Sequence, residues 1–283
     1  MLLHAPAPVT PISLQSGVGY VRAIRTPTRG TILTHMRADS PLRIFSPCVG
    51  CPTAWVVTST LGGGLVGGDD IRLSLDVEAG ASVLLTTQAS TKAYRSTRPT
   101  RQCLATRVAD AGLLVVLPDP IVGFAGSTFE QQQVYELADR ASLLALDWMV
   151  SGRRASGERW AFDGYVSRFQ IAREGRPVFY DHLRLSQTDG PVIERMRAFH
   201  SYAVAVVTGP VLAPLADRIL TTVSSAAVER DSDVLMSAAP LSGGDGVVVR
   251  MASVSGERLS ATLRESFRPI VPILGEDPWA RRW

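Results

Sequence analysis

Short segments with apolar or β-branched residues at every second position follow one another through the first two thirds of the chain. Such alternation predicts strands, because neighbouring residues of a strand point to opposite faces of a sheet. The segments are TILTHMRAD, TAWVVTST, DIRLSLDVEAGASVLLTTQA, QCLATRVADAGLLVVLP, TFEQQQVYELADRASLLALDWMV and YVSRFQIAREGRPVFYDHLRL. The turns EAGAS, ADAGL and AREGR contain glycine and resemble hairpin turns. Their regular recurrence predicts stacked, β-helix-like sheets that are rich in antiparallel pairs.

The pattern changes after residue 205. Apolar residues recur at helical spacing over 211–230 and over 255–274, where Ser255 is a partial N-cap, and the run GVVVRMASV between them predicts a buried strand. We therefore expect an α+β fold that is predominantly β, with its helices in the C-terminal third. The predicted organisation is a single domain over 1–283, with a β-rich part over 15–205 and a helix–strand–helix part over 206–275.

The bulk composition excludes several classes of protein. The chain has 283 residues, 46% of them hydrophobic, which is enough for a sizeable core. Its net charge of +3 is spread along the sequence and forms no basic stripe, so we predict no nucleic-acid partner. No apolar run approaches the roughly 20 residues of a membrane helix, and the first residues lack the basic start of a secretory signal. We expect a cytoplasmic protein without membrane attachment.

A glycine-rich stretch, LGGGLVGGDD, contains the spacing G-x-G-x-x-G at Gly62, Gly64 and Gly67. This spacing binds dinucleotides only when a helix follows it, because the helix N-terminus holds the pyrophosphate. Here a strand pattern follows, and Asp69 and Asp70 would repel phosphate. We predict instead a turn or bulge that another part of the backbone approaches closely.

Asp69 and Asp70 themselves allow two interpretations. Adjacent carboxylates offer hard oxygen ligands to a cation. Alternatively, one of them caps the turn and the other is solvated, which is common because aspartate is a favoured turn residue. The residues alone leave both interpretations open.

A second group of charged residues lies in DWMVSGRRASGERW. Asp147 stands among leucines and a tryptophan, and a buried carboxylate must find a partner or take up a proton. We expect an arginine a turn away, such as Arg153, to be that partner, with Glu158 in the same loop. The group is either a structural ion pair or the wall of a polar site.

The remaining reactive residues form no recognisable catalytic constellation. Cys48 and Cys51 form a C-x-x-C motif, but Cys103 alone does not complete a zinc ligand set. The four histidines show no metal-binding spacing, and no G-x-S-x-G motif is present. The only lysine, Lys92, stands in a chain rich in arginine. Either Lys92 has a role that an arginine cannot fill, or its presence on a solvated strand is a matter of chance.

Three motifs together resemble one family. GGGLVGGD is followed by TTQASTKAYRS, then by LLALDWMVSGRRASGERW and EGRPVFYDHLRL. In this order and with similar spacing they resemble the urease accessory protein D family, called H in some organisms. The C-x-x-C motif is not part of that pattern. The resemblance implies a largely β fold with stacked sheets and additional helices.

The resemblance also implies a function. It implies a scaffold, not an enzyme, that binds the urease apoprotein and accessory proteins F and G. The scaffold would help to deliver nickel, in transit and not tightly bound, through an internal passage. By motif, the metal route is assigned to Asp69, Asp70, Asp147 and Glu158, and the partner or structural motifs to Gly64, Gly67, Gly68, Gln88, Lys92, Tyr94, Arg95 and Arg153. The alternative is an uncharacterised enzyme that uses the acidic loop residues in acid–base chemistry.

Overall fold

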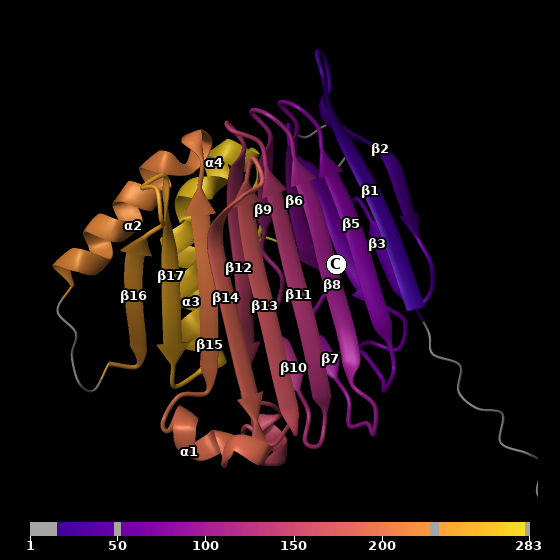
Figure 1. Cartoon of the computed structure of the whole chain (residues 1–283), viewed down its shortest axis with the longest axis vertical. Helices are drawn as coiled ribbons and strands as arrows, with labels where there is room; N and C mark the ends of the chain where they lie inside the picture. The colour runs from indigo at the N-terminus through magenta and orange to yellow at the C-terminus, as the bar shows by residue number, and fades with distance from the viewer. Residues whose placement is uncertain (1–15, 48–51, 227–231, 281–283) are drawn as a thin grey trace, which may run out of the picture.

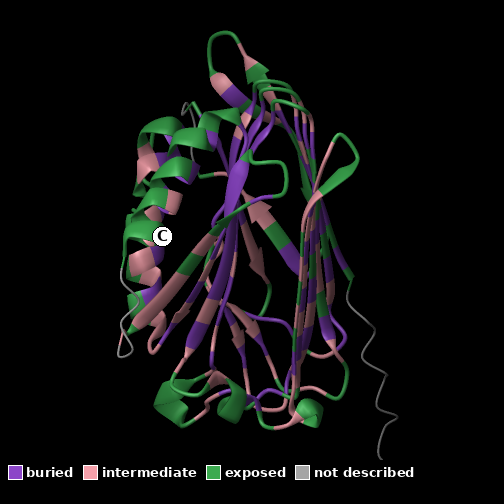
Figure 2. Cartoon of the chain, turned by 60° about the vertical axis from the view of Figure 1, so that its left-hand side comes forward, coloured by how far each residue is buried: buried purple, intermediate pink, exposed green. Residues whose placement is uncertain are grey.

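In the computed structural model, which describes residues 16–47, 52–226 and 232–280, two β-sheets face each other and helices cover one of them (Figures 1 and 2). The seven-stranded sheet contains, in spatial order, β14 (Arg176–Ser186), β13 (Gly164–Arg173), β11 (Thr128–Leu137), β8 (Thr100–Val108), β5 (Asp70–Val77), β1 (Ser16–Thr26) and β2 (Gly30–Ala38). This confirms the predicted α+β class, predominantly β, with stacked sheets.

The ten-stranded sheet contains β16 (Val234–Pro240), β17 (Gly246–Ser253), β15 (Ser201–Thr208), β12 (Ser142–Val150), β9 (Leu113–Val116), β6 (Ser82–Thr87), β4 (Ala54–Thr60) and β3 (Leu42–Phe45), and the short strands β10 (Ile121–Gly123) and β7 (Thr91–Ala93) join it beside β12. The helices are α1 (Val192–Met196), α2 (Ala213–Ser225), α3 (Gly256–Phe267) and α4 (Val271–Leu274), with 3-10 turns η1 (Arg154–Ser156), η2 (Gln187–Asp189), η3 (Pro210–Leu212) and η4 (Arg268–Ile270). The helices α2, α3 and α4 lie on the outer face of the ten-stranded sheet (Figure 1).

The strands pair differently from the hairpins that the sequence predicts. The EAGAS and ADAGL turns join β5 to β6 and β8 to β9, which lie in different sheets, so the hairpin prediction is wrong for both. Of the three turns for which the sequence predicts a hairpin, AREGR alone forms one, between the antiparallel strands β13 and β14. Central neighbours such as β5 and β8 are parallel, while antiparallel pairs lie toward the edges. Alternation reveals which side chains face inward, but it carries no information about which strand lies alongside.

This winding gives the two-sheet body two different ends. At one end, tight turns over 78–81, 109–112 and 138–141 connect the sheets, and we call it the turn end. At the other end, longer segments over 61–69, 88–99 and 151–163 make the connection, and we call it the loop end. Because binding residues are found disproportionately on loops held by a rigid scaffold, the loop end is where a functional site is expected.

Apolar layers hold the elements together. One cluster fills the space between the sheets, and another joins the ten-stranded sheet to the helices. In the second cluster, Leu259, Leu263 and Phe267 of α3 are at most 3% exposed, as their four-residue spacing predicts. The Ser255 side chain accepts a hydrogen bond from the Arg258 backbone nitrogen at 3.1 Å, which confirms the N-cap. The prediction missed β16, an edge strand with no fully buried residue.

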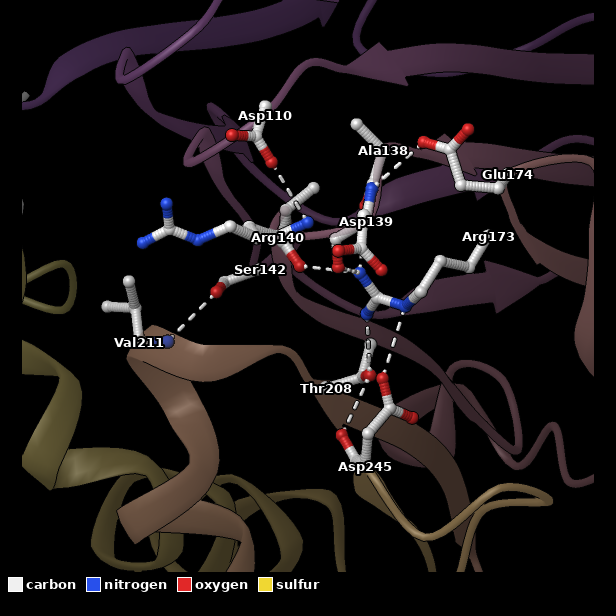
Figure 3. A network of polar contacts seen from close by, with 11 residues as sticks. Asp110, Ala138, Asp139, Arg140, Ser142, Arg173, Glu174, Thr208, Val211 and Asp245 are labelled. Carbon is white, nitrogen blue, oxygen red and sulfur yellow. Dashed lines mark hydrogen bonds and ion pairs between the residues drawn. The ribbon is translucent and has the colours of Figure 1, made fainter.

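At the turn end, one arginine ties the two sheets together (Figure 3). Arg173, at the end of β13, donates to three carbonyl oxygens around the β11–β12 turn at 2.9, 2.7 and 3.0 Å. It also donates to Thr208 Oγ1 at 3.0 Å, and its Nε lies 3.1 Å from the Asp245 carboxylate. Its side chain is only 12% exposed. Arg173 therefore supplies the donors that this corner of the fold needs.

Candidate functional site

A cavity of about 150 Å³ lies between the two sheets and extends to the loop end. Apolar side chains form part of its wall, among them Leu42, Ile71, Leu85 and Val116. Polar side chains interrupt that wall, namely Thr86, Thr87, Gln88, Gln102, Asp119, Gln131, Gln133 and Asp147. A polar space of this size has room for several water molecules. It could therefore also admit a small hydrated cation.

Asp147 is the acidic residue at the inner part of this cavity. It lies on β12 and faces the seven-stranded sheet, where its carboxylate oxygens accept hydrogen bonds from Gln131 Nε2 and Ser167 Oγ, both at 2.6 Å. Burial between the sheets raises its pKa, and the two hydrogen bonds partly oppose that rise. Asp147 thus joins the two sheets through polar contacts and presents a carboxyl group to the cavity.

The expected ion pair between Asp147 and Arg153 is not formed, so that prediction is wrong. Arg153 lies beyond the end of β12, where its guanidinium pairs with Glu158, with Nε at 3.0 Å from Oε2. The ion pair lowers the pKa of Glu158. Asp147 points into the interior from within the strand, whereas Arg153 is half exposed on the loop, so sequence proximity does not bring them together.

The glycine-rich stretch forms the closely packed turn that the sequence predicts. Leu65 N donates to the Lys92 carbonyl oxygen at 2.7 Å, and Tyr94 N donates to the Leu65 carbonyl oxygen at 2.9 Å. A Cβ atom at Gly64 would lie 2.7 Å from the Lys92 carbonyl oxygen, and one at Gly67 would overlap the Ser96 side chain. Glycine is required because two backbones meet here. No helix follows, since β5 begins at Asp70.

The two aspartates after this turn have structural contacts. Asp69 is 6% exposed, and its carboxylate accepts a hydrogen bond from Val66 N at 2.9 Å, which closes the turn. Asp70 pairs with Arg72 at 2.6 Å on the outer face of the seven-stranded sheet. Gly68, just before them, has a φ of 92°, in the left-handed region. Neither aspartate lines the cavity. Asp69 is the turn cap that the second interpretation predicts, whereas Asp70 is ion-paired with Arg72 and not simply solvated.

Motifs that are far apart in the sequence meet at the loop end. The rings of Tyr94 and Phe124 pack edge to face with centroids 5.0 Å apart, and the Arg153 guanidinium lies 4.3 Å from the Phe124 ring centroid. Glu158 accepts a hydrogen bond from Ala125 N at 3.4 Å, and Arg95 packs against the 124–126 turn at Gly126. The TKAYRS and SGRRASGERW motifs therefore stabilise one continuous surface.

Sequence reasoning missed Gln131 and Gln133, which line the cavity, and Ser167, which hydrogen-bonds to Asp147. A usable signal was present in FEQQQVYEL, where alternate positions face inward and two of them are glutamines. A glutamine on the buried face of a strand needs partners, and Gln131 has Asp147, Ser167 and the Tyr165 hydroxyl within 3.3 Å of its Nε2.

The described residues hold no group of three His, Cys, Asp or Glu side chains arranged to bind a metal ion. Cys48 and Cys51 lie outside the described residues. Cys103 is half-buried on β8, and burial raises the pKa of its thiol. Within the described ranges, no helix is both long and apolar enough to cross a membrane.

The fold and the cavity thus define a two-sheet β protein with a polar interior that is reached from its loop end. The model of the UreD urease accessory protein family matches residues 16–283, and the chain belongs to that family. A urease accessory protein UreD from Sorangium cellulosum (strain So ce56) is 46% identical over 89% of this chain and 80% of its own length. One from Anaeromyxobacter sp. (strain Fw109-5) is 42% identical over 99% and 96%. Urease accessory protein D from Oryza sativa subsp. indica is 29% identical over 93% and 95%.

Proposed function

We propose that this chain is a scaffold for urease maturation that passes nickel through the cavity between its sheets to the urease apoprotein. Membership of the family supports a role in urease maturation. The partners in this proposal are the urease apoprotein and accessory proteins F and G, which act together in the cytoplasm. The nickel ion is cargo and is not a resident cofactor.

The observation that supports this proposal best is the buried carboxyl group of Asp147, which lines the cavity together with Asp119. A divalent cation that leaves water needs oxygen ligands, and Asp147 with the neighbouring Gln131 and Gln133 can supply them. Oxygen donors bind nickel less firmly than thiolates do, so the ion can move on. We assign the ion route to Asp147 first.

Asp69, Asp70 and Glu158 remain candidates for a weaker contribution at the loop end. Each of them already serves an internal contact, with Val66 N, Arg72 and Arg153 respectively. An ion would have to displace that contact. We therefore expect their replacement to affect nickel transfer less than the replacement of Asp147.

The enzyme alternative would require an acid–base pair in the cavity. Asp147 has a raised pKa, but the groups that donate to its carboxylate are the amide of Gln131 and the hydroxyl of Ser167, which do not titrate. The geometry therefore favours a passage over an active site.

The experiment measures nickel per active site in urease matured with Asp147→Asn, and compares it with urease matured with Asp70→Asn. Asparagine keeps nearly the same shape as aspartate and removes its charge, but its amide nitrogen cannot accept a hydrogen bond as the second carboxylate oxygen does. We expect a severalfold loss of nickel with Asp147→Asn and nearly normal nickel with Asp70→Asn, while both variants still assemble with urease. Normal nickel loading with Asp147→Asn would refute the route. Failure of the wild-type chain to assemble with urease would refute the proposed function itself.

A further inference from the structure

Most arginines on the outer face of the seven-stranded sheet have a carboxylate partner. Arg72 pairs with Asp70, Arg101 with Glu130 and Arg107 with Asp76, at 2.6, 3.1 and 3.1 Å. Arg72 and Asp70 lie two residues apart on β5, whereas the other two pairs follow the strand register, which places Arg101 beside Glu130 and Arg107 beside Asp76. The sheet face is therefore nearly neutral and needs no partner to balance its charge.

The adjoining part of the loop end differs. Among the described residues, no carboxylate lies within 4 Å of the side-chain nitrogens of Lys92, Arg95 or Arg98. Arg95 and Arg98 are exposed, and Lys92 is partly exposed. Beside these cations, two large apolar side chains face solvent, with Leu61 43% and Val66 53% exposed. We call the set of Leu61, Val66, Lys92, Arg95 and Arg98 the glycine-turn face.

The glycine-turn face is rigid. The backbone bonds between Leu65 and both Lys92 and Tyr94 join its two segments, and the close contacts at Gly64 and Gly67 leave no space between them. Asp69 fixes the end of the turn through Val66 N. A preformed surface loses little conformational entropy on binding, which is what a docking site requires.

The glycine-turn face also adjoins the entrance of the cavity. Thr60 and Gly63 of the glycine-rich segment line the cavity, as do Gln88 and Ser90, which lie just before Lys92. A protein bound to this face would cover the entrance. An ion in the cavity could then pass to the bound protein without returning to bulk water.

We propose that the glycine-turn face is a docking surface for a partner protein that presents carboxylates around an apolar centre. Charge complementarity identifies the partner, because the segment that carries three cations without a carboxylate partner among the described residues packs against the segment that carries two exposed apolar side chains. This inference rests on the proposed function, under which the occupant is the urease apoprotein at the outlet of the cavity. A second copy of the chain and a polyanion such as nucleic acid are the competing occupants.

The single lysine makes a direct test possible. The full-length chain, alone and assembled with the urease apoprotein, is treated with sulfo-NHS acetate, and acetylation of Lys92 is followed by mass spectrometry. We expect the rate of acetylation to fall severalfold in the assembly and to recover when urease is removed. Equal acetylation in both states would overturn the inference even if the assembly forms.

Charge reversal supplies a second measurement with a matched control. Arg95→Glu with Arg98→Glu changes the glycine-turn face, while Arg25→Glu with Arg29→Glu makes the same change of charge on exposed residues at the turn end. We expect the affinity for the urease apoprotein to fall by about tenfold or more for the first variant and to stay near wild type for the second. Equal affinity of the two variants would refute the docking surface.

The remaining outcomes identify the other occupants. If protection of Lys92 rises with the concentration of the chain alone, the occupant of the glycine-turn face is a second copy of the chain and not the urease apoprotein. Protection by a DNA oligonucleotide at 150 mM salt, an ionic strength at which exposed charges are screened beyond roughly 8 Å, would replace it by a polyanion. If the wild-type chain and urease do not assemble at all, the proposed function fails and not only the assignment of this face.

Discussion

Arg173 at the turn end and the cations of the glycine-turn face at the loop end differ in how their charges are satisfied. At the turn end, Arg173 makes all its contacts within the chain, to three carbonyls, Thr208 and Asp245 (Figure 3). At the loop end, Lys92, Arg95 and Arg98 have no carboxylate partner among the described residues. The first arrangement stabilises the fold, whereas the second leaves charge available for another molecule.

The difference follows from the lengths of the connections. The turns of the turn end are short, and their backbone groups are satisfied locally or by Arg173. The connections of the loop end are longer and carry the polar entrance of the cavity. A protein that binds partners keeps some polar and charged groups free of internal contacts. The loop end, where such groups lie on long connections, is therefore where function is expected. Four variants, compared by their free energy of unfolding, test this division.

The largest effect is expected at the turn end. Arg173→Leu removes the hydrogen bonds to the Ala141 carbonyl oxygen and to Thr208, and the ion pair with Asp245. We expect the free energy of unfolding to fall by about 3 kcal/mol, because an unsatisfied buried acceptor costs roughly 1–3 kcal/mol. Urea denaturation measures this loss. A loss below that of the loop-end variants would show that the turn end does not carry more of the stability.

Gly64→Ala is expected to have the next largest effect. Its new Cβ would lie 2.7 Å from the Lys92 carbonyl oxygen, a backbone atom that cannot move without breaking the bonds of Leu65. Overpacking of this kind costs roughly 1–3 kcal/mol. The control is Gly157→Ala, which has no atom within 4 Å but has a φ of 76°, so only backbone strain of about 1 kcal/mol is expected. A larger loss for the control would contradict the close-packed turn.

Asp147→Asn has a smaller effect, which depends on pH. Burial raises the pKa of Asp147 in the folded chain above its ordinary value of 3.8. Between these two pKa values the folded state keeps a proton that the unfolded state has released. The free energy of unfolding of the wild type therefore falls as the pH rises from the lower pKa to the higher one. Asparagine does not titrate, so we expect the variant to gain stability relative to the wild type as the pH rises from 3.8 through the raised pKa of Asp147. A difference that is constant with pH would show that burial does not perturb Asp147.

Glu158→Gln should have the smallest effect, with the opposite dependence on pH. The Arg153 guanidinium lowers the pKa of Glu158 below its ordinary value of 4.5. Its contribution to stability is present above that value and is lost as the pH falls through the lowered pKa. Because Arg153 is half exposed, we expect a loss of less than about 1 kcal/mol at pH 7 that disappears in acid. A loss that persists at pH 3 would indicate a packing effect and not a charge effect.

The sequence by itself determined the type of most long elements and which of their side chains are buried, although it missed the strands β1 and β16. Alternation marked the inward positions of β5, β11 and β13, and four-residue spacing marked the buried stripe of α3. The glycine spacing before Asp69 correctly indicated a close approach of two backbones. These properties are local, because they depend on the period of each element and on the space around single residues.

Only the tertiary structure decided which strands lie side by side and which carboxylate faces the interior. Asp70 stands beside Arg101, and Asp147 meets Gln131 and Ser167 of the other sheet, although nothing local in the sequence joins these residues. Between β4 and β13 the chain passes repeatedly from one sheet to the other, so most strands that are neighbours in a sheet are separated in the sequence by a strand of the other sheet. β12 is covered on both faces, by the seven-stranded sheet and by the helices, so its burial does not alternate, and only the tertiary structure shows that Asp147 points into the cavity.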